Sequence, residues 1–143
     1  MGSGKAHGKN LVFKLDTTAG VETDISTHVR SVDGLPGEVE LGDITAAGDS
    51  GHKTIIGLQN ATITLECVFD DTADKAWAVI SNFAADTATR TFSYGPAGNT
   101  SGYAKLTGEC RISKCSLPGK VTDPLIFTAE LKVDGAVSVT TWA

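Results

Sequence analysis

The chain has 143 residues, a formal net charge of −5 and 20% charged residues. This length corresponds to one domain with a single hydrophobic core. The acidic balance argues against a basic nucleic-acid footprint and against binding to an anionic membrane surface. No apolar run approaches the roughly 20 residues that span a bilayer, and the N-terminus lacks the apolar segment of a secretory signal.

The N-terminal part predicts an arm followed by a hairpin. Residues 1–9 offer little apolar surface and are expected to form a flexible arm, with a single domain over 10–143. Residues 11–16 and 21–30 each alternate between two faces, which predicts two strands joined as a hairpin.

Between the hairpin and the middle of the chain the pattern weakens. A long loop is predicted at about 42–57, because its residues are small and polar without periodicity. A loop of this length in a compact domain is usually functional. Ile55, Ile56 and Leu58 at its return are expected to be core residues, with an apolar contact offered to a neighbour as the alternative.

The middle of the chain combines a strand with a helix. Residues 61–69 alternate strictly, which indicates a strand with one buried face. The apolar spacing then changes to three and four residues, predicting one helix at about 72–86. This helix is expected to pack on the sheet through Trp77, Ile80 and Phe83.

The predicted helix start is rich in polar residues. Asp71 or Thr72 is expected to cap the first turn, and Asp74 lies where the helix dipole favours an anion. These structural roles explain the acidic cluster without assigning it general acid or base chemistry.

The C-terminal part predicts further antiparallel strands. Residues 104–112 and 125–133 alternate, and Asp134-Gly135 is a hairpin turn signal before a last strand that ends at Trp142. With short turns throughout, the chain is predicted to be mainly β. The expected fold is an antiparallel β-sandwich or barrel of about seven or eight strands with one flanking helix.

Little in the sequence indicates catalysis. His7, His28 and His52 have no Cys, Asp or Glu neighbour at metal or triad spacing and are interpreted as solvated side chains. Ser50 beside His52 lacks the rigid support and third group that a catalytic pair needs. We therefore expect no enzyme and no catalytic residue.

The cysteines give no metal site either. Cys67 and Cys110 fall on apolar strand faces, and Cys115 is the third, odd cysteine. Free thiols of this kind suit a reducing cytoplasm, and no pair has zinc spacing. Neither a metal nor a cofactor is expected.

The chain combines an N-terminal arm, a long Gly-rich loop, a single central helix and the closing segment FTAELKVDGAVSVTTW. In this order of elements it resembles the major tail tube proteins of long-tailed, siphophage-type bacteriophages. The segments that carry the resemblance are 9–14, 60–65 and 127–142. The type VI secretion tube protein shares this fold and is kept as a related interpretation.

The resemblance implies six copies per ring and stacked rings that form the tail tube, the conduit for DNA ejection. It implies the tape measure protein, tail terminator and tip proteins as partners, with synthesis in the bacterial host cytoplasm and residence in the virion tail. It also implies that DNA passes through the tube; the acidic chain leads us to expect no specific DNA binding, because an acidic wall does not hold phosphates, and no membrane partner is expected.

Two groups of residues are candidates for these roles. The candidates for contact between rings are Asp43, Ile44, Asp49, His52, Lys53, Ile55 and Ile56. The candidates for charge in the lumen are Glu22, Asp24, Glu109 and Glu130.

Two other functions compete with the tube. A non-catalytic β-sandwich binding or decoration module would need an exposed aromatic cluster, for which Tyr94, Tyr103 and Trp142 are the few candidates. A small hydrolase comes third.

Overall fold

The computed structural model describes residues 7–17, 20–73, 75–85 and 88–143. In chain order the elements are η1 (Gly8–Asn10), β1 (Val12–Asp16), β2 (Glu22–Asp24), η2 (Ser26–His28), β3 (Val29–Asp33), β4 (Glu38–Asp43), β5 (Thr54–Asn60), β6 (Thr62–Val68), α1 (Ala76–Ala84), β7 (Arg90–Gly95), β8 (Ala104–Ser116) and β9 (Ile126–Thr141), where η1 and η2 are 3-10 helices. Most of the predicted arm, residues 1–6, lies outside the described residues.

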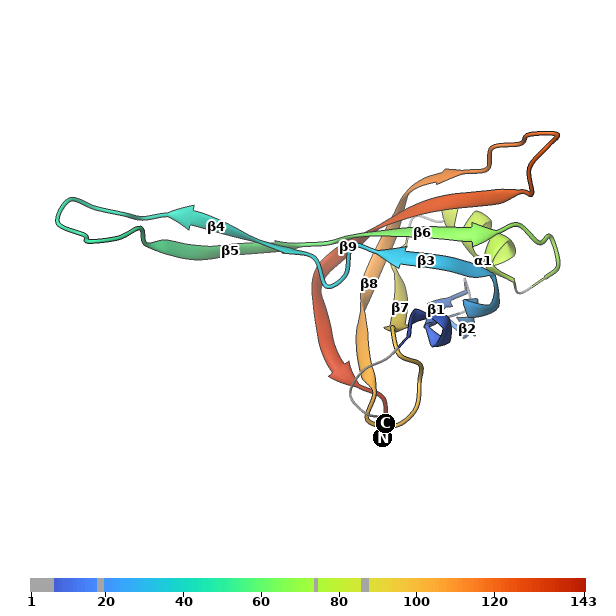
Figure 1. Cartoon of the computed structure of the whole chain (residues 1–143), viewed down its shortest axis with the longest axis horizontal. Coiled ribbons are helices and arrows are strands. Elements are labelled where there is room, and N and C mark those ends of the chain that lie inside the picture. The colour runs from blue at the N-terminus through green and yellow to red at the C-terminus, as the bar shows by residue number, and fades with distance from the viewer. Residues whose placement is uncertain (1–6, 18–19, 74, 86–87) are drawn as a thin grey trace.

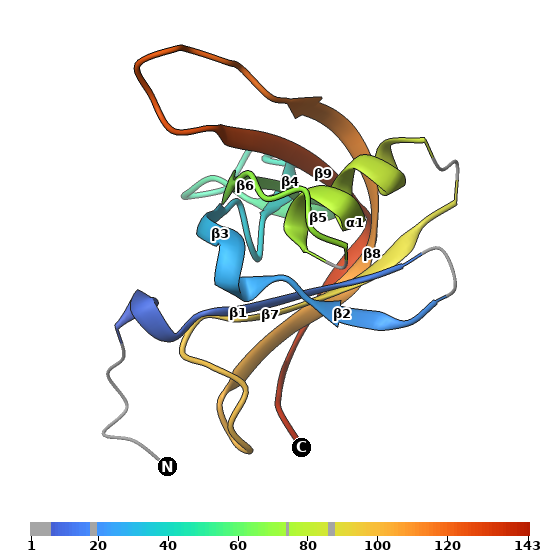
Figure 2. The ribbon, with the colours of Figure 1, turned by 90° about the vertical axis from the view of Figure 1, so that its right-hand side faces the viewer.

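The described strands form one large antiparallel sheet and one separate ribbon (Figure 1). The seven-stranded sheet has the order β2-β1-β7-β8-β9-β6-β3, and β4 pairs only with β5. Figure 2 shows the sheet bent, with β1, β2 and β7 on one side, β3 and β6 on the other, and α1 between them. The predicted mainly β, antiparallel fold with one helix is confirmed, and the sheet stays open rather than closing into a barrel.

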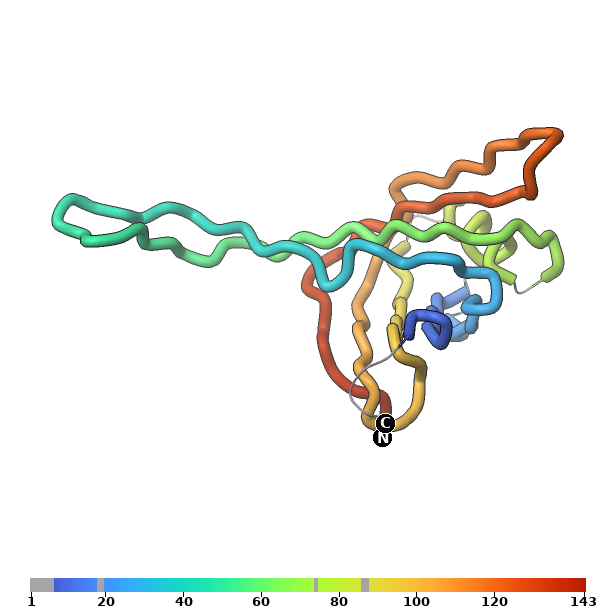
Figure 3. Tube along the Cα trace, viewed as in Figure 1, coloured from blue at the N-terminus to red at the C-terminus, as the bar shows by residue number. Residues whose placement is uncertain are grey.

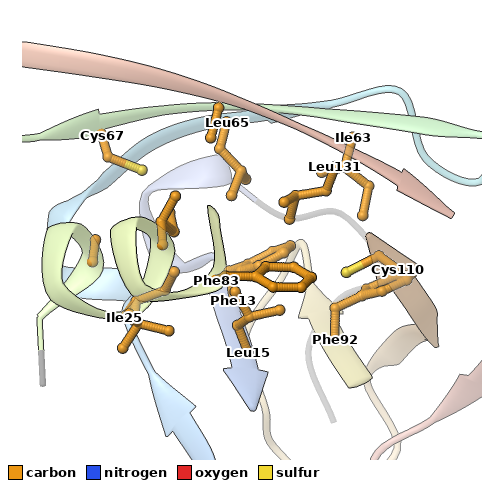
Figure 4. Close-up of a cluster of buried hydrophobic side chains, with 14 of the residues drawn as sticks. Phe13, Leu15, Ile25, Ile63, Leu65, Cys67, Phe83, Phe92, Cys110 and Leu131 are labelled. Carbon is orange, nitrogen blue, oxygen red and sulfur yellow. The ribbon is translucent and has the colours of Figure 1, made fainter. Parts of the chain in front are cut away.

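The core fills the space between the two halves of the bent sheet (Figure 4). Phe13 and Phe92 from one half stack with ring centroids 6.3 Å apart, while Ile63, Leu65 and Leu131 enter from the other half, and all five are fully buried. Each such side chain contributes about 1.5–3 kcal/mol to folding by leaving water. The alternation in the sequence therefore identified the buried face correctly.

The helix closes one open side of this core. Ile80 and Phe83 are fully buried, and the half-buried Trp77 lies 5.3 Å from the ring of Phe69 and 5.2 Å from that of Phe127. The helix packs against β6 and β8. It therefore holds together elements that are distant in sequence.

The helix begins later than predicted. Its N-cap is Lys75, which makes no side-chain cap hydrogen bond, so Asp71 and Thr72 do not cap it. The backbone N–H of Thr72 instead donates to the Asp70 carboxylate at 2.9 Å, a local turn that competes with helix formation. The role expected for Asp74 lies outside the described residues.

The predicted second strand at 21–30 is also broken. The N–H of Ile25 donates to the carbonyl of Phe13 at 3.1 Å, and the Ser26 hydroxyl accepts from the N–H of Phe13 at 2.9 Å. The chain turns here as a 3-10 helix, so Ile25 enters the core instead of continuing along the sheet. The pairing of β1 with β2 as a hairpin is confirmed.

The hairpin turn predicted at Asp134-Gly135 is wrong. β9 runs through it without interruption, and the register with β8 shifts from the Glu109–Asp134 pair to the Thr107–Ser138 pair. Gly135 has φ +97°, which a bulged residue without a side chain adopts easily. The same dipeptide that suits a turn therefore accommodates a bulge.

Candidate assembly surfaces

The ribbon of β4 and β5 projects far from the sheet (Figures 1 and 3). Its strands pair from Glu38–Asn60 at the base to Asp43–Thr54 near the tip. The loop predicted at 42–57 is therefore shorter than expected, because only residues 44–53 connect β4 to β5. We call residues 38–60 the projecting hairpin.

The base of the projecting hairpin is built into the sheet. β5 continues into β6 through the buried Ala61, whose carbonyl accepts the N–H of Val133 at 3.0 Å. Gly34 and Gly37, with φ +95° and +101°, let the chain cross here, because a Cβ at Gly34 would lie 1.8 Å from the carbonyl oxygen of Thr62. This close crossing fixes the direction in which the hairpin leaves the body.

The projecting hairpin exposes large apolar side chains along its length. Ile56 and Leu58 are 74% and 76% exposed, Ile55 is also exposed, and Leu41 lies opposite Ile56 in the ribbon. The expectation that Ile55, Ile56 and Leu58 belong to the core is wrong, because their strand extends beyond the body that could cover them. Exposed apolar surface of this kind marks an interaction site.

The tip of the hairpin is ordered by polar contacts. The Asp43 carboxylate accepts the N–H of Thr45 at 2.8 Å, and Asp49 accepts the N–H of Ala46 at 2.7 Å and lies 3.1 Å from the Lys53 ammonium. The bonds from Thr45 lower the pKa of Asp43, and those from Ala46 and Lys53 lower the pKa of Asp49. These contacts order the tip locally, although its sequence has no periodicity.

The other predicted tip residues surround these contacts. The N–H of Ile44 donates to the carbonyl of Lys53 at 3.0 Å, and the N–H of Lys53 donates to the Thr45 hydroxyl at 2.9 Å. His52 is exposed. The structure thus gathers all seven candidate contact residues on one projecting element.

Three of the four candidate lumen carboxylates lie on the outer face of the β2-β1-β7-β8 half. Glu22 pairs with Asp16, Glu109 pairs with Thr91 and with Asp134, and Asp24 follows Glu22 by two positions. Burial, and next the charges of Glu22 and Glu109, raise the pKa of Asp16. We call Asp16, Glu22, Glu109 and Asp134 the acidic row.

The acidic row contains two residues that the sequence did not single out. Asp134 was assigned to a turn, and the pairing that brings Asp16 to Glu109 joins strands far apart in the chain. Two cations lie beside the row, with Lys14 Nζ 3.4 Å from Glu22 and Arg111 Nε 3.9 Å from Asp134.

The fourth candidate, Glu130, is half-buried and lies away from the acidic row. It pairs with Lys114 on β8 and with Thr64 on β6, in the other half of the sheet. Its position separates it from the carboxylates on β1, β2 and β8.

His28 is not the solvated side chain that the sequence suggested. Its Nε2 lies 3.1 Å from Oδ2 of Asp70, its Nδ1 lies 2.9 Å from the Thr27 hydroxyl, and its side chain is largely buried. The contact with Asp70 ties η2 to the connection between β6 and α1. In the described part of the chain, no group of three His, Cys, Asp or Glu side chains could hold a metal ion.

None of the helices in the described part of the chain has the length and hydrophobicity of a membrane-spanning segment. No protein-family model matches this chain, and no curated protein matches it.

Solved structures do match. A chain from the tail of an empty GTA particle, computed with helical refinement and C6 symmetry, is 20% identical, covers 96% of this chain and 100% of its own length, and has a TM-score of 0.72. The SPP1 tail tube gives 10% identity, 96% and 81% coverage and a TM-score of 0.70.

A chain from the sheath-tube complex of the extracellular contractile injection system PVC gives 12% identity, coverage of 97% and 93%, and a TM-score of 0.69. The chain therefore has, over nearly its whole length, the fold that these tail and contractile-injection chains share.

Proposed function

We propose that this protein is a non-catalytic structural subunit of a phage-type tail tube. It self-assembles into hexameric rings that stack into the conduit for DNA ejection and resides in the virion tail, with tape measure, terminator and tip proteins as partners. The observation that carries this proposal is the match of the whole chain to the fold of tail tube chains. Copies of one chain are its main partner.

The projecting hairpin supports self-assembly. A two-stranded ribbon alone is marginally stable in water, and this ribbon leaves six large apolar side chains exposed: Val39, Leu41, Ile44, Ile55, Ile56 and Leu58. When a neighbouring copy covers these side chains, their apolar surface leaves the water and the ribbon is stabilised. The hairpin thus supplies the contact between rings in this proposal.

The acidic row supports a conduit for DNA. Its carboxylates stand on the sheet face opposite the core, where Lys14 and Arg111 neutralise them only partly. A wall of net negative charge repels phosphates and gives no counterion-release gain on binding DNA. In this proposal the acidic face lines the lumen.

Replacing residues 44–53 by Asn-Gly tests the role of the tip, because this dipeptide closes a two-residue hairpin. We expect a folded chain, by circular dichroism and unfolding temperature, that forms no tubes in negative-stain electron microscopy. The variant Ser50→Ala, which alters one exposed side chain in the intact tip, is the control and should form tubes. Tubes formed by the shortened chain would contradict this role.

The alternative of a sugar-binding or decoration module has less support. All nine aromatic residues lie in the described part of the chain and none is exposed. Trp142 is half-buried, with the ammonium groups of Lys14 and Lys105 5.4 and 4.7 Å from its ring centroid. A strictly monomeric protein that binds a sugar would favour this alternative.

The tube of a contractile injection system is a related candidate, favoured by the match to the sheath-tube complex. In such a tube the projecting hairpin and the acidic row would have the same roles. A sheath that co-purifies with the tubes would favour it over the tube of a long-tailed phage.

A further inference from the structure

A second exposed apolar surface lies at the turn between β8 and β9. Val121 is fully exposed in this turn, Leu117 and Leu125 at its two ends are partly exposed, and the partly exposed Val68 pairs with Ile126, the residue after Leu125. We call Val68, Leu117, Val121 and Leu125 the β8–β9 patch. Most of the exposed large apolar side chains outside the projecting hairpin belong to it.

The turn that carries the β8–β9 patch also forms a hollow. A hollow of about 310 Å³ beside it is lined by Pro118, Lys120, Asp123, Pro124 and Ile126. The turn is fixed at both ends of this hollow, because the N–H of Asp123 donates to the carbonyl of Lys120 at 3.3 Å and the N–H of Phe69 donates to that of Leu125 at 3.0 Å. Two prolines stiffen the same turn.

The two surfaces differ in charge. The projecting hairpin contains four carboxylates and one lysine, a net charge of −3. The turn at 117–125 contains Lys120 and Asp123, a net charge of zero, and the cations of β8 lie further back, where Arg111 is near Asp134 and Lys114 pairs with Glu130. Two acidic hairpins repel each other, whereas a surface without net charge that presents Lys120 does not repel a hairpin, so the charge disfavours pairing of two copies of the same surface.

The two surfaces also lie at opposite ends of the molecule. Figure 1 shows the projecting hairpin at one end of the longest axis and the β8–β9 turn at the other. An open polymer of identical subunits needs two different, complementary surfaces, so that each copy offers one and receives the other. An arrangement at opposite ends lets the contact repeat along a line.

We propose that the β8–β9 patch is the receptor for the projecting hairpin of the next copy of this chain. In this contact the apolar side chains of Leu41 and Ile56 pack on Val121 beside the hollow, and the hairpin carboxylates face Lys120. The inference rests on the proposed tube function and adds to it the surface on which the hairpin docks.

Single substitutions on each surface test the contact. Val121→Asp and Ile56→Asp place a charge at a fully exposed and a 74% exposed position, so both chains should fold like the wild type. Each should raise the protein concentration at which tubes appear by about thirtyfold or more, as expected for an apolar anchor lost from an interface. Val139→Asp, at a 65% exposed position outside both surfaces, is the matched control and should assemble like the wild type.

A mixture of the two defective variants gives a sharper result. The intact hairpin of Val121→Asp still fits the intact patch of Ile56→Asp, so one contact forms between the two variants, but it cannot repeat. We expect equimolar mixtures to give complexes that neither variant forms alone, by analytical ultracentrifugation, and no long tubes.

Cross-linking identifies the contact directly. Chains with Ile56→Cys and chains with Val121→Cys, each carrying Cys115→Ser, should form a disulfide between copies on mild oxidation, whereas Ile56→Cys with Val139→Cys should not. Wild-type tubes together with Val121→Asp tubes at the same concentration and no cross-link would overturn this contact and leave the tube function intact. Wild-type chains that stay monomeric would overturn the tube function and this inference with it.

Discussion

The three cysteines differ in their surroundings, and this difference can be measured. Burial raises the pKa values of Cys67 and Cys110 to about 12, and Cys115 is only half-buried. At pH 8 a thiol of pKa 12 is roughly one part in ten thousand thiolate, the form that reacts. We expect Cys115 alone to react with a thiol reagent in the native protein, and all three to react in denaturant. Rapid native reaction of two thiols would contradict the described core.

Asp70 links stability to pH. Hydrogen bonds from Thr72 and then from His28 lower its pKa to about 2. Because the folded pKa lies below the value of about 4 in an unfolded chain, this stabilisation is complete above pH 4 and is lost as the pH falls from about 4 to 2. Asp70→Asn should therefore unfold more easily than the wild type at pH 6, and the difference should shrink by pH 3 in urea titrations. A difference that grows on acidification would contradict the assignment.

The sequence predicts single residues well where the cause is local. Strict alternation placed Leu65 and Cys67 in the core, because neighbouring strand residues point to opposite faces. Residue spacing gave the wrong interpretation of His28, because its partner Asp70 is 42 positions away. It also did not reveal the acidic neighbours of Asp16, which lie on other strands. Such contacts depend on strand order, which no local pattern encodes.

Among the elements, the helix has the most direct energetic test. Phe83 lies on the buried face of α1, is fully buried, and its ring lies 4.6 Å from the guanidinium of Arg90. Phe83→Ala should reduce the free energy of unfolding by about 3–5 kcal/mol, measured in urea, because it leaves a cavity. The exposed neighbour Ala84→Ser is the control and should cost about 0.5 kcal/mol or less. Equal effects would show that the helix does not cover the core.

Element boundaries were harder to predict than element types. The Asp134-Gly135 dipeptide suits a turn, but the 13-residue β8 offers backbone partners on both sides of it, so the strand continues through a bulge. Ile55 and Ile56 have the composition of a core strand, and only the fold shows that no described residue covers them. In both cases tertiary pairing decided what local composition left open.

At the scale of the whole molecule, charge predicts how the protein treats DNA. The net charge of −5 and the acidic row should prevent stable binding to double-stranded DNA, so we expect no shift in a gel assay even at 50 mM salt. The variant Glu22→Lys with Glu109→Lys should bind DNA measurably and lose that binding as salt rises. Tight binding by the wild type would contradict an acidic conduit.

Whether copies of this chain build a tube can be seen by electron microscopy of the purified wild-type protein over a range of concentrations. We expect rings with six-fold symmetry that stack into hollow tubes as the concentration rises. Particles that remain monomeric at every concentration, with the hairpin apolar residues uncovered, would contradict this expectation.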